Sequence, residues 1–172
     1  MTRSDKQPPM KQGSPHDFQT DDKMPVDILS KYINKENIIW ECAAGKGLMA
    51  GNFRNNDFKV IETDLLTGQD FLMYSPPDCD VIITNPPFDL KNQFIERAYI
   101  IGKPFAFLLP LTTFEGKQRQ PFFKEFGLQV IFLPRRVNFI TPSGLGGGAW
   151  FATAWFTNWL NLPKDLIFES ET

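Results

Sequence analysis

The sequence contains very few of the residues that build disulfides or bind metal ions. Its 172 residues include two cysteines, Cys42 and Cys79, and one histidine, His16. Two cysteines cannot form a disulfide framework, and with one histidine they do not make a zinc ligand set. We therefore expect no metal centre, and a reducing intracellular compartment such as the cytoplasm.

Long apolar runs and a strong excess of one charge are also missing. No apolar run approaches the ~20 residues that a membrane-spanning helix needs, so we expect no membrane association. The net charge of −2 argues against a general nucleic-acid coat protein, but it allows a local basic rim around a site that handles one base. The hydrophobic content of 42% is that of an ordinary globular protein with a substantial core.

Apolar runs alternate with helical patterns along most of the chain. This alternation predicts an α/β fold with a mostly parallel sheet and helices on both faces, and the last two strands would form an antiparallel hairpin. We expect a disordered tail at 1–17, a single domain at 18–165 and a short tail at 166–172. The predicted strands are 38–40, 58–64, 80–83, 105–110, 130–133 and 149–159, and the predicted helices are 25–33, 48–53, 90–101 and 114–126.

The turn Thr84-Asn85-Pro86-Pro87-Phe88 directly follows the apolar run 80–83. Its two prolines have a fixed φ and no N–H, so they end the strand in a stiff turn. In an open parallel sheet, ligands bind at the carboxyl ends of the strands. An amide side chain, nearby backbone carbonyls and an aromatic ring suit a planar base that carries an exocyclic amine. The alternative is a Pro-Pro turn that only ends the strand.

Two segments before this turn are typical of a nucleotide site. The strand 38–40, the turn Glu41-Cys42-Ala43-Ala44-Gly45-Lys46-Gly47 and the helix 48–53 form the opening of a doubly wound fold, where glycines let the backbone approach a ligand closely. A purely structural turn is the alternative. The next strand ends in acids, and a carboxylate there commonly accepts the ribose hydroxyls of an adenosine-containing cofactor. Asp64 is the first candidate for this role and Glu62 the second.

The pair Asp70-Phe71 follows that strand. Asp70 is a candidate to accept a hydrogen bond from the adenine amine of a cofactor, and Phe71 is a candidate to pack on the adenine ring. For Asp70, a turn or a helix cap is an equal alternative.

In this order, the segments resemble those of S-adenosylmethionine-dependent amino-methyltransferases with an Asn-Pro-Pro-Phe (NPPF) motif, in particular small phage and bacterial N6-adenine DNA methyltransferases. Residues 85–88 match the family tetrapeptide, and the turn 41–47 matches its cofactor loop, with Cys42 where many relatives have Pro. The resemblance covers about 17–159. It implies a Rossmann-like methyltransferase fold, with a mostly parallel seven-stranded sheet and an antiparallel last strand. The cofactor-binding residues that it implies are Phe18, Thr20, Glu41, Ala43, Gly45, Gly47, Asp64, Asp70, Phe71 and Asn85.

The activity that the resemblance implies is methyl transfer from S-adenosylmethionine to the N6 amine of adenine in DNA, with S-adenosylhomocysteine as product. The Asn85 side-chain oxygen and the Pro86 carbonyl would accept the two amine protons and aim the nitrogen lone pair at the methyl group, in the turn that Pro87 stiffens. Phe88 would stack on the base, which must be flipped out of a duplex or presented single-stranded, and Phe139 would close its other face.

Four basic residues are candidates for contacts with nucleic-acid phosphates. A solvated helix face is the alternative for the first two, and surface ion pairing is the alternative for the last two. They are Lys117, Arg119, Arg135 and Arg136.

The tetrapeptide alone does not identify the molecule that carries the amine. Adenine in RNA, the N4 amine of cytosine and a protein glutamine present the same chemistry. A different class of function is an inactive subunit that binds S-adenosylmethionine beside an active partner. Because the chain shows no separate target-recognition domain, we expect recognition to be slight, or to come from the loop 140–148, the tail or a partner protein.

Overall fold

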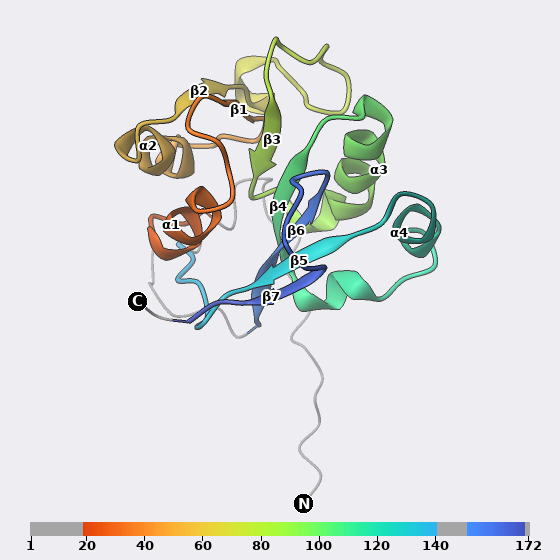
Figure 1. Ribbon diagram of the computed structural model, residues 1–172. Coiled ribbons are helices and arrows are strands. Elements are labelled where there is room, and N and C mark those ends of the chain that lie inside the picture. The colour runs from red at the N-terminus through yellow and green to blue at the C-terminus, as the bar shows by residue number, and fades with distance from the viewer. Residues whose placement is uncertain (1–18, 141–150, 171–172) are drawn as a thin grey trace, which may run out of the picture.

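One mixed sheet runs through the computed structural model, which describes residues 19–140 and 151–170 (Figure 1). Within these residues its strand order is β2-β1-β3-β4-β6-β5-β7. β6 runs antiparallel to both of its neighbours, β4 and β5, whereas the other neighbouring strands are parallel. The strands are β1 (Ile38–Glu41), β2 (Lys59–Glu62), β3 (Val81–Thr84), β4 (Phe105–Pro110), β5 (Gln129–Phe132), β6 (Thr153–Asn158) and β7 (Leu166–Phe168).

The expected fold class is confirmed, because the sheet is seven-stranded, mostly parallel and of the α/β type. The antiparallel strand is β6, and β7 follows it and lies parallel to β5. Where a tail is expected at 166–172, the structure instead places residues 166–168 in the sheet. A run of three residues is too short to predict a strand, and the stacking of Phe168 on Phe132, with ring centroids 4.6 Å apart, is a contact between distant parts of the sequence. The expected tail 1–17, Phe18 and the loop 141–148 lie outside the described residues.

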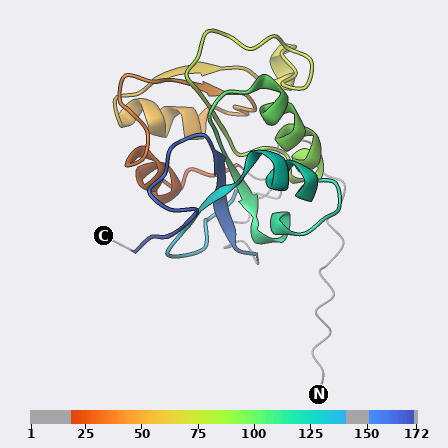
Figure 2. The same cartoon turned by 45° about the vertical axis from the view of Figure 1, so that its right-hand side comes forward.

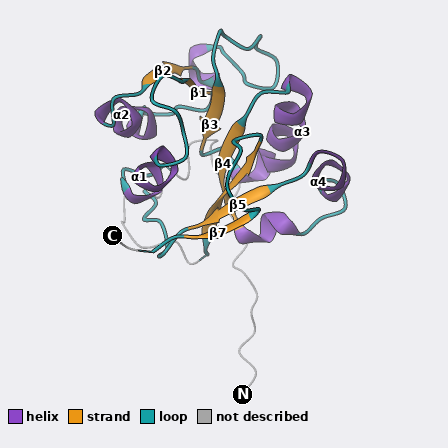
Figure 3. Ribbon diagram, in the orientation of Figure 1, coloured by secondary structure: helices purple, strands orange, loops and turns teal. Residues whose placement is uncertain are grey.

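The helices cover the sheet on both faces (Figures 2 and 3). α1 and α2 pack together on one face, and α3 and α4 pack together on the other. Their bounds are α1 (Met24–Ser30), α2 (Leu48–Asn55), α3 (Lys91–Ile101) and α4 (Gln120–Phe126), and short 3-10 turns occur at η1 (Leu65–Thr67), η2 (Phe88–Leu90) and η3 (Leu111–Phe114).

The helix predicted at 114–126 is interrupted in the structure. Phe114, the first residue of the predicted helix, belongs to η3, and α4 begins only at Gln120. Gly116 causes the break, because its φ of +115° is incompatible with a right-handed helix. A Cβ at this position would lie 2.7 Å from a guanidinium nitrogen of Arg119, so the glycine also makes room for that side chain.

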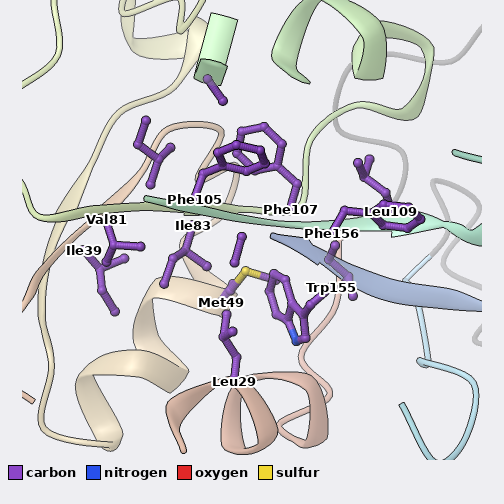
Figure 4. Close-up of a cluster of buried hydrophobic side chains, with 14 of the residues drawn as sticks. Leu29, Ile39, Met49, Val81, Ile83, Phe105, Phe107, Leu109, Trp155 and Phe156 are labelled. Atoms are coloured by element: carbon purple, nitrogen blue, oxygen red, sulfur yellow. The ribbon is translucent and has the colours of Figure 1, made fainter. Parts of the chain in front are cut away.

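Large apolar side chains fill both faces of the sheet (Figure 4). On the side of α1 and α2, Leu29 and Met49 lie over Ile83 and Trp155, and the Trp155 indole N–H donates to the Pro25 carbonyl over 2.9 Å. On the other side, alternate positions of β4 carry aromatic rings towards α3. Because β3 and β4 are covered on both faces, the ends of the central strands are held rigidly in place.

Candidate active site

The tetrapeptide lies at the carboxyl end of β3, a central strand whose four residues are all buried. β1 and β4 flank β3 in parallel. Asn85 is half-buried with its side-chain oxygen inside the protein, and Pro86 is buried. Pro87 has φ −54° and caps the short turn η2, which begins at Phe88. The two prolines therefore restrict the backbone of this turn, including that of Asn85, at the edge of the sheet.

Three aromatic rings meet beside the tetrapeptide. The structure brings Phe139, from the segment after β5, to Phe88: their centroids are 6.0 Å apart and the rings are nearly perpendicular. Phe151 contacts both, at 5.5 Å from Phe88 and 5.9 Å from Phe139. Phe151 belongs to the predicted strand 149–159, and nothing in its local sequence pattern distinguishes a ring near the site from one in the core. Phe88 and Phe139 are both buried, so a base that stacks here must move part of this cluster.

The turn 41–47 lies at the same edge of the sheet, after the neighbouring strand β1. Gly45 and Gly47 both adopt positive φ, at +54° and +75°. A Cβ on Gly47 would lie 2.7 Å from a carboxylate oxygen of Glu62, and a Cβ on Gly45 would lie 2.8 Å from the amide nitrogen of Gln19. Both glycines are therefore favoured by their backbone conformation, and the ends of the Glu62 and Gln19 side chains lie close over them.

The two acids after β2 have different surroundings. Asp64 is buried, and its oxygens accept hydrogen bonds from the backbone amides of Gly45 and Leu66, each over 2.8 Å. Glu62 is more open: one of its oxygens faces Gly47, and the other pairs with Arg54 at 2.5 Å. Arg54 also donates to the Val60 carbonyl on the outer side of β2. Asp64 thus holds the glycine loop, whereas Glu62 faces it.

Glu41 is the most perturbed acid of this region. Burial raises the pKa of its carboxyl to about 8, and the nearby charges of Glu62 and Asp64 act in the same direction. The Thr84 hydroxyl and the Ala43 amide, which donates to Glu41 over 3.2 Å, partly oppose the rise. At neutral pH Glu41 is therefore largely protonated, and it lies at the end of β1, where the loop begins.

The structure places Phe71 and Asp70 in structural roles. Phe71 is 2% exposed and stacks on Phe94 at 4.7 Å, with edge contacts to Trp40 and Phe107. Its ring is thus part of the core and is already packed on several sides. Asp70 accepts a hydrogen bond from the Leu72 amide over 2.9 Å, which is the turn-forming alternative considered from the sequence.

Of the four basic candidates, two are engaged within the protein. Arg119 is buried, donates to the Thr113 carbonyl over 2.8 Å and also bonds the side chain of Asn92. It therefore joins η3 to α3 instead of facing a phosphate. Arg135 pairs with Asp22 through both terminal nitrogens. Lys117 and Arg136 are exposed.

A segment before α1 lies against both the glycine loop and the residues that follow β5. Thr20, implied by the resemblance as a cofactor residue, donates from its hydroxyl to the Asn138 carbonyl over 2.5 Å. Gln19 pairs with Ile140 through the backbone. From the sequence, Asp22 is a candidate cap for the helix that follows and Gln19 only precedes that helix; nothing local places either residue at the site, because their partners lie more than a hundred residues away or in a loop with no apolar pattern.

Within residues 19–140 and 151–170, no helix is long and apolar enough to cross a membrane. In the same residues, no group of three or more histidine, cysteine or carboxylate side chains is placed to hold a metal ion.

No protein-family model matches the chain, and no curated protein matches it by sequence. Among solved structures, it is similar to precorrin-6y C5,15-methyltransferase from Geobacter metallireducens, with 14% identity over 83% of this chain and 93% of that one and a TM-score of 0.48. It is also similar to precorrin 8w decarboxylase from Methanobacterium thermoautotrophicum, with 13% identity over 78% of this chain and 89% of that one and a TM-score of 0.46. A third similar structure is tRNA (m1A58) methyltransferase from Aquifex aeolicus, with 16% identity over 79% of this chain and 68% of that one and a TM-score of 0.42.

Proposed function

We propose that the chain transfers a methyl group from S-adenosylmethionine to the N6 amine of adenine in DNA. One observation carries the proposal: the Asn-Pro-Pro-Phe turn and the glycine loop follow two adjacent parallel strands, β3 and β1, at the same edge of the sheet. Neighbouring strands lie about 4.8 Å apart, so the two turns are within reach of one bound nucleoside and one target base. Ligands of open α/β sheets bind at this edge.

The residues on the β1 side fit a nucleoside that carries two ribose hydroxyls. Positive-φ glycines allow the close approach of a ligand to the loop, and a partly open carboxylate, Glu62, faces Gly47. We therefore assign the ribose contact to Glu62 and give Asp64, whose two oxygens already accept backbone amides, the role of holding Gly45. The proposed cofactor site also keeps four residues that the resemblance implies: Glu41, Ala43, Gly45 and Gly47. S-adenosylmethionine, when bound there, supplies the electrophilic methyl group.

On the β3 side, the chain's own groups orient the amine. The lone pair of an exocyclic adenine amine is delocalised into the ring, so the nitrogen is a poor nucleophile. The Asn85 side-chain oxygen and the Pro86 carbonyl would accept its two protons, which localises the lone pair and directs it at the methyl group. The two prolines fix the backbone of this turn, and a base would reach the Asn85 oxygen, which is buried in the free protein, once part of the aromatic cluster has moved. Phe88 would stack on the base after part of the aromatic cluster has moved, which fits a target that is flipped out of a duplex.

A transfer assay tests the proposal. The protein is incubated with S-adenosylmethionine carrying a labelled methyl group and with separate DNA, RNA and protein acceptors, and the modified base is identified by mass spectrometry. We expect N6-methyladenine in DNA. Asn85→Ala should abolish transfer, whereas the exposed Asn55→Ala on α2 should leave it unchanged. Label in RNA or protein alone would replace the DNA assignment, and activity retained by Asn85→Ala would overturn the mechanism.

A further inference from the structure

Asp22 lies at the centre of a set of contacts between residues 19–22 and residues 135–140, the two ends of the described segment 19–140. Its carboxylate pairs with Arg135, which donates over 2.7 and 3.0 Å, and it also accepts the Asn138 amide over 3.2 Å. The side chain is only 6% exposed. Burial acts to raise the pKa of Asp22, but the hydrogen bonds from Arg135, Asn138 and Met24 hold it below its usual value. The carboxylate is therefore charged whenever the protein is folded at neutral pH.

The two residues before Asp21 continue these contacts along the same segment. The Thr20 hydroxyl donates to the Asn138 carbonyl, and the Ile140 amide donates to the Gln19 carbonyl over 2.6 Å. Residues 19–22 thus follow residues 135–140 step by step. Phe139 lies inside that stretch and contacts Phe88 of the tetrapeptide. Residues 19–22 therefore hold the backbone on both sides of the Phe139 ring, which lies beside the proposed target base.

The side chain of Gln19 reaches in the other direction. Its carbonyl oxygen accepts the Lys46 amide over 3.2 Å, and its amide nitrogen lies against Gly45, where a Cβ would be only 2.8 Å away. One residue thus bonds the glycine loop through its side chain and the target-side segment through its backbone. The 3.2 Å bond to Lys46 and the backbone pairing with Ile140 therefore link the loop and this segment through a single residue.

We propose that residues Gln19–Asp22, which we call the strap, couple cofactor binding to target binding, with Gln19 and Asp22 as positioning residues. This inference rests on the proposed function of the two turns. A ligand that orders Gly45 and Lys46 orders the strap, and the strap then sets the position of Phe139, one ring of the cluster that a stacking base must enter. By linkage, a base bound at Phe88 changes the affinity for the cofactor by the same factor.

Binding measurements test the coupling. The probes are S-adenosylhomocysteine, measured by calorimetry, and a labelled single-stranded oligonucleotide containing adenine, measured by anisotropy, each with and without the other. Coupling between sites is typically about 5- to 150-fold, and we expect at least about fivefold in the natural chain. We expect each of two variants, Asp22→Asn and Gln19→Ala, to reduce the coupling factor to about one, which means no coupling. Asp21→Asn, an exposed neighbour, is the matched control and should keep it. Coupling that is absent from the natural chain or retained by both variants would overturn the proposal.

Hydrogen exchange of the free protein gives a second readout that needs no ligand. Asp22→Asn should speed exchange not only at the Asn138 and Ile140 amides but also at the Lys46 amide, which it does not contact. Gln19→Ala should speed exchange at Asn138 as well as at Lys46. If each variant affects only the amides next to it, the strap does not couple the two sides. If S-adenosylhomocysteine does not bind but the exchange pattern is as expected, the proposed function fails and the mechanical link stands.

Discussion

The carboxylate of Asp64 accepts the backbone amide of Gly45 over 2.8 Å, across the gap between the ends of β2 and β1. This bond joins two segments that are both candidates for the same ligand. Asp64, the first candidate for the ribose contact, is therefore engaged in holding the glycine loop, whereas Glu62 faces that loop. Substitutions of these two acids should therefore separate cofactor binding from stability.

Glu62→Gln should weaken binding of S-adenosylhomocysteine by roughly tenfold or more, because a charge-assisted hydrogen bond to the ribose contributes about 1.5–3 kcal/mol. The free energy of unfolding should change little, since Glu62 is partly exposed and its pair with Arg54 is of the surface type. Calorimetry and urea denaturation measure the two effects. A variant with unchanged affinity would remove Glu62 from the cofactor site.

Asp64→Ala should behave in the opposite way with respect to stability. It leaves the amides of Gly45 and Leu66 without their acceptor, which should lower the free energy of unfolding by about 1–3 kcal/mol per buried group. Binding should weaken as well, but only through the displaced loop. Asp70→Ala, which removes one partly buried turn contact elsewhere, serves as the comparison. Stability equal to that of the natural chain would contradict the holding role.

Stability should depend on pH through Glu41. Its pKa in the folded protein is raised from 4.5 to about 8, so the folded state holds a proton that the unfolded state has already lost. Its contribution is therefore fully present below about pH 4.5 and declines as pH rises towards about 8, by roughly 1.4 kcal/mol per unit of pKa difference. Denaturation between pH 5 and 8.5 should show this slope for the natural chain and a flatter profile for Glu41→Gln. Parallel profiles would mean that Glu41 is ionised in the folded protein.

Phe71→Ala should lower the free energy of unfolding by about 3–5 kcal/mol, the usual cost of removing a large ring from a packed core. The milder Phe71→Leu keeps most of the volume and should bind S-adenosylhomocysteine as the natural chain does. A large loss of affinity in the leucine variant would instead support direct packing of this ring on the cofactor adenine. Thermal denaturation and calorimetry together separate the two roles.

Arg119→Leu should destabilise the protein without changing how its DNA binding responds to salt. The guanidinium donates to the buried Thr113 carbonyl of η3 over 2.8 Å, and losing this bond costs about 1–3 kcal/mol. Arg136→Gln, at an exposed position, should instead reduce the slope of log affinity against log salt by about one. Anisotropy titrations at several salt concentrations make the comparison. A reduced slope in the Arg119 variant would return it to the phosphate contacts.

The sheet and the position of the tetrapeptide could be predicted because both depend on local pattern. Buried strands appear as apolar runs, and two consecutive prolines mark the end of the strand before them. The division of roles between Glu62 and Asp64 could not be predicted, since both are acids at the end of one strand and only the contact with Gly45 distinguishes them. Arg119 and Phe71 are similar cases: a basic residue on a helical pattern and an aromatic one in a loop give no local sign of burial.

The strap escaped prediction for a related reason. Asp22 precedes a helix, which is a common place for a capping residue, and its partner Arg135 is 113 residues further along the chain. The pairing of β7 with β5 likewise depends on contacts across the fold and not on the three residues themselves. Sequence patterns thus describe elements well, but they do not describe which polar groups from distant elements meet.

Arg54 has a further consequence at the side of the sheet. β2 is the first strand in the order, and its outer backbone groups could accept a strand from another molecule. By bonding the Val60 carbonyl and placing a charge there, Arg54 protects this edge against intermolecular pairing. A chain that lost Arg54 would therefore be prone to self-association along β2, in addition to carrying an unneutralised Glu62 at its proposed cofactor site.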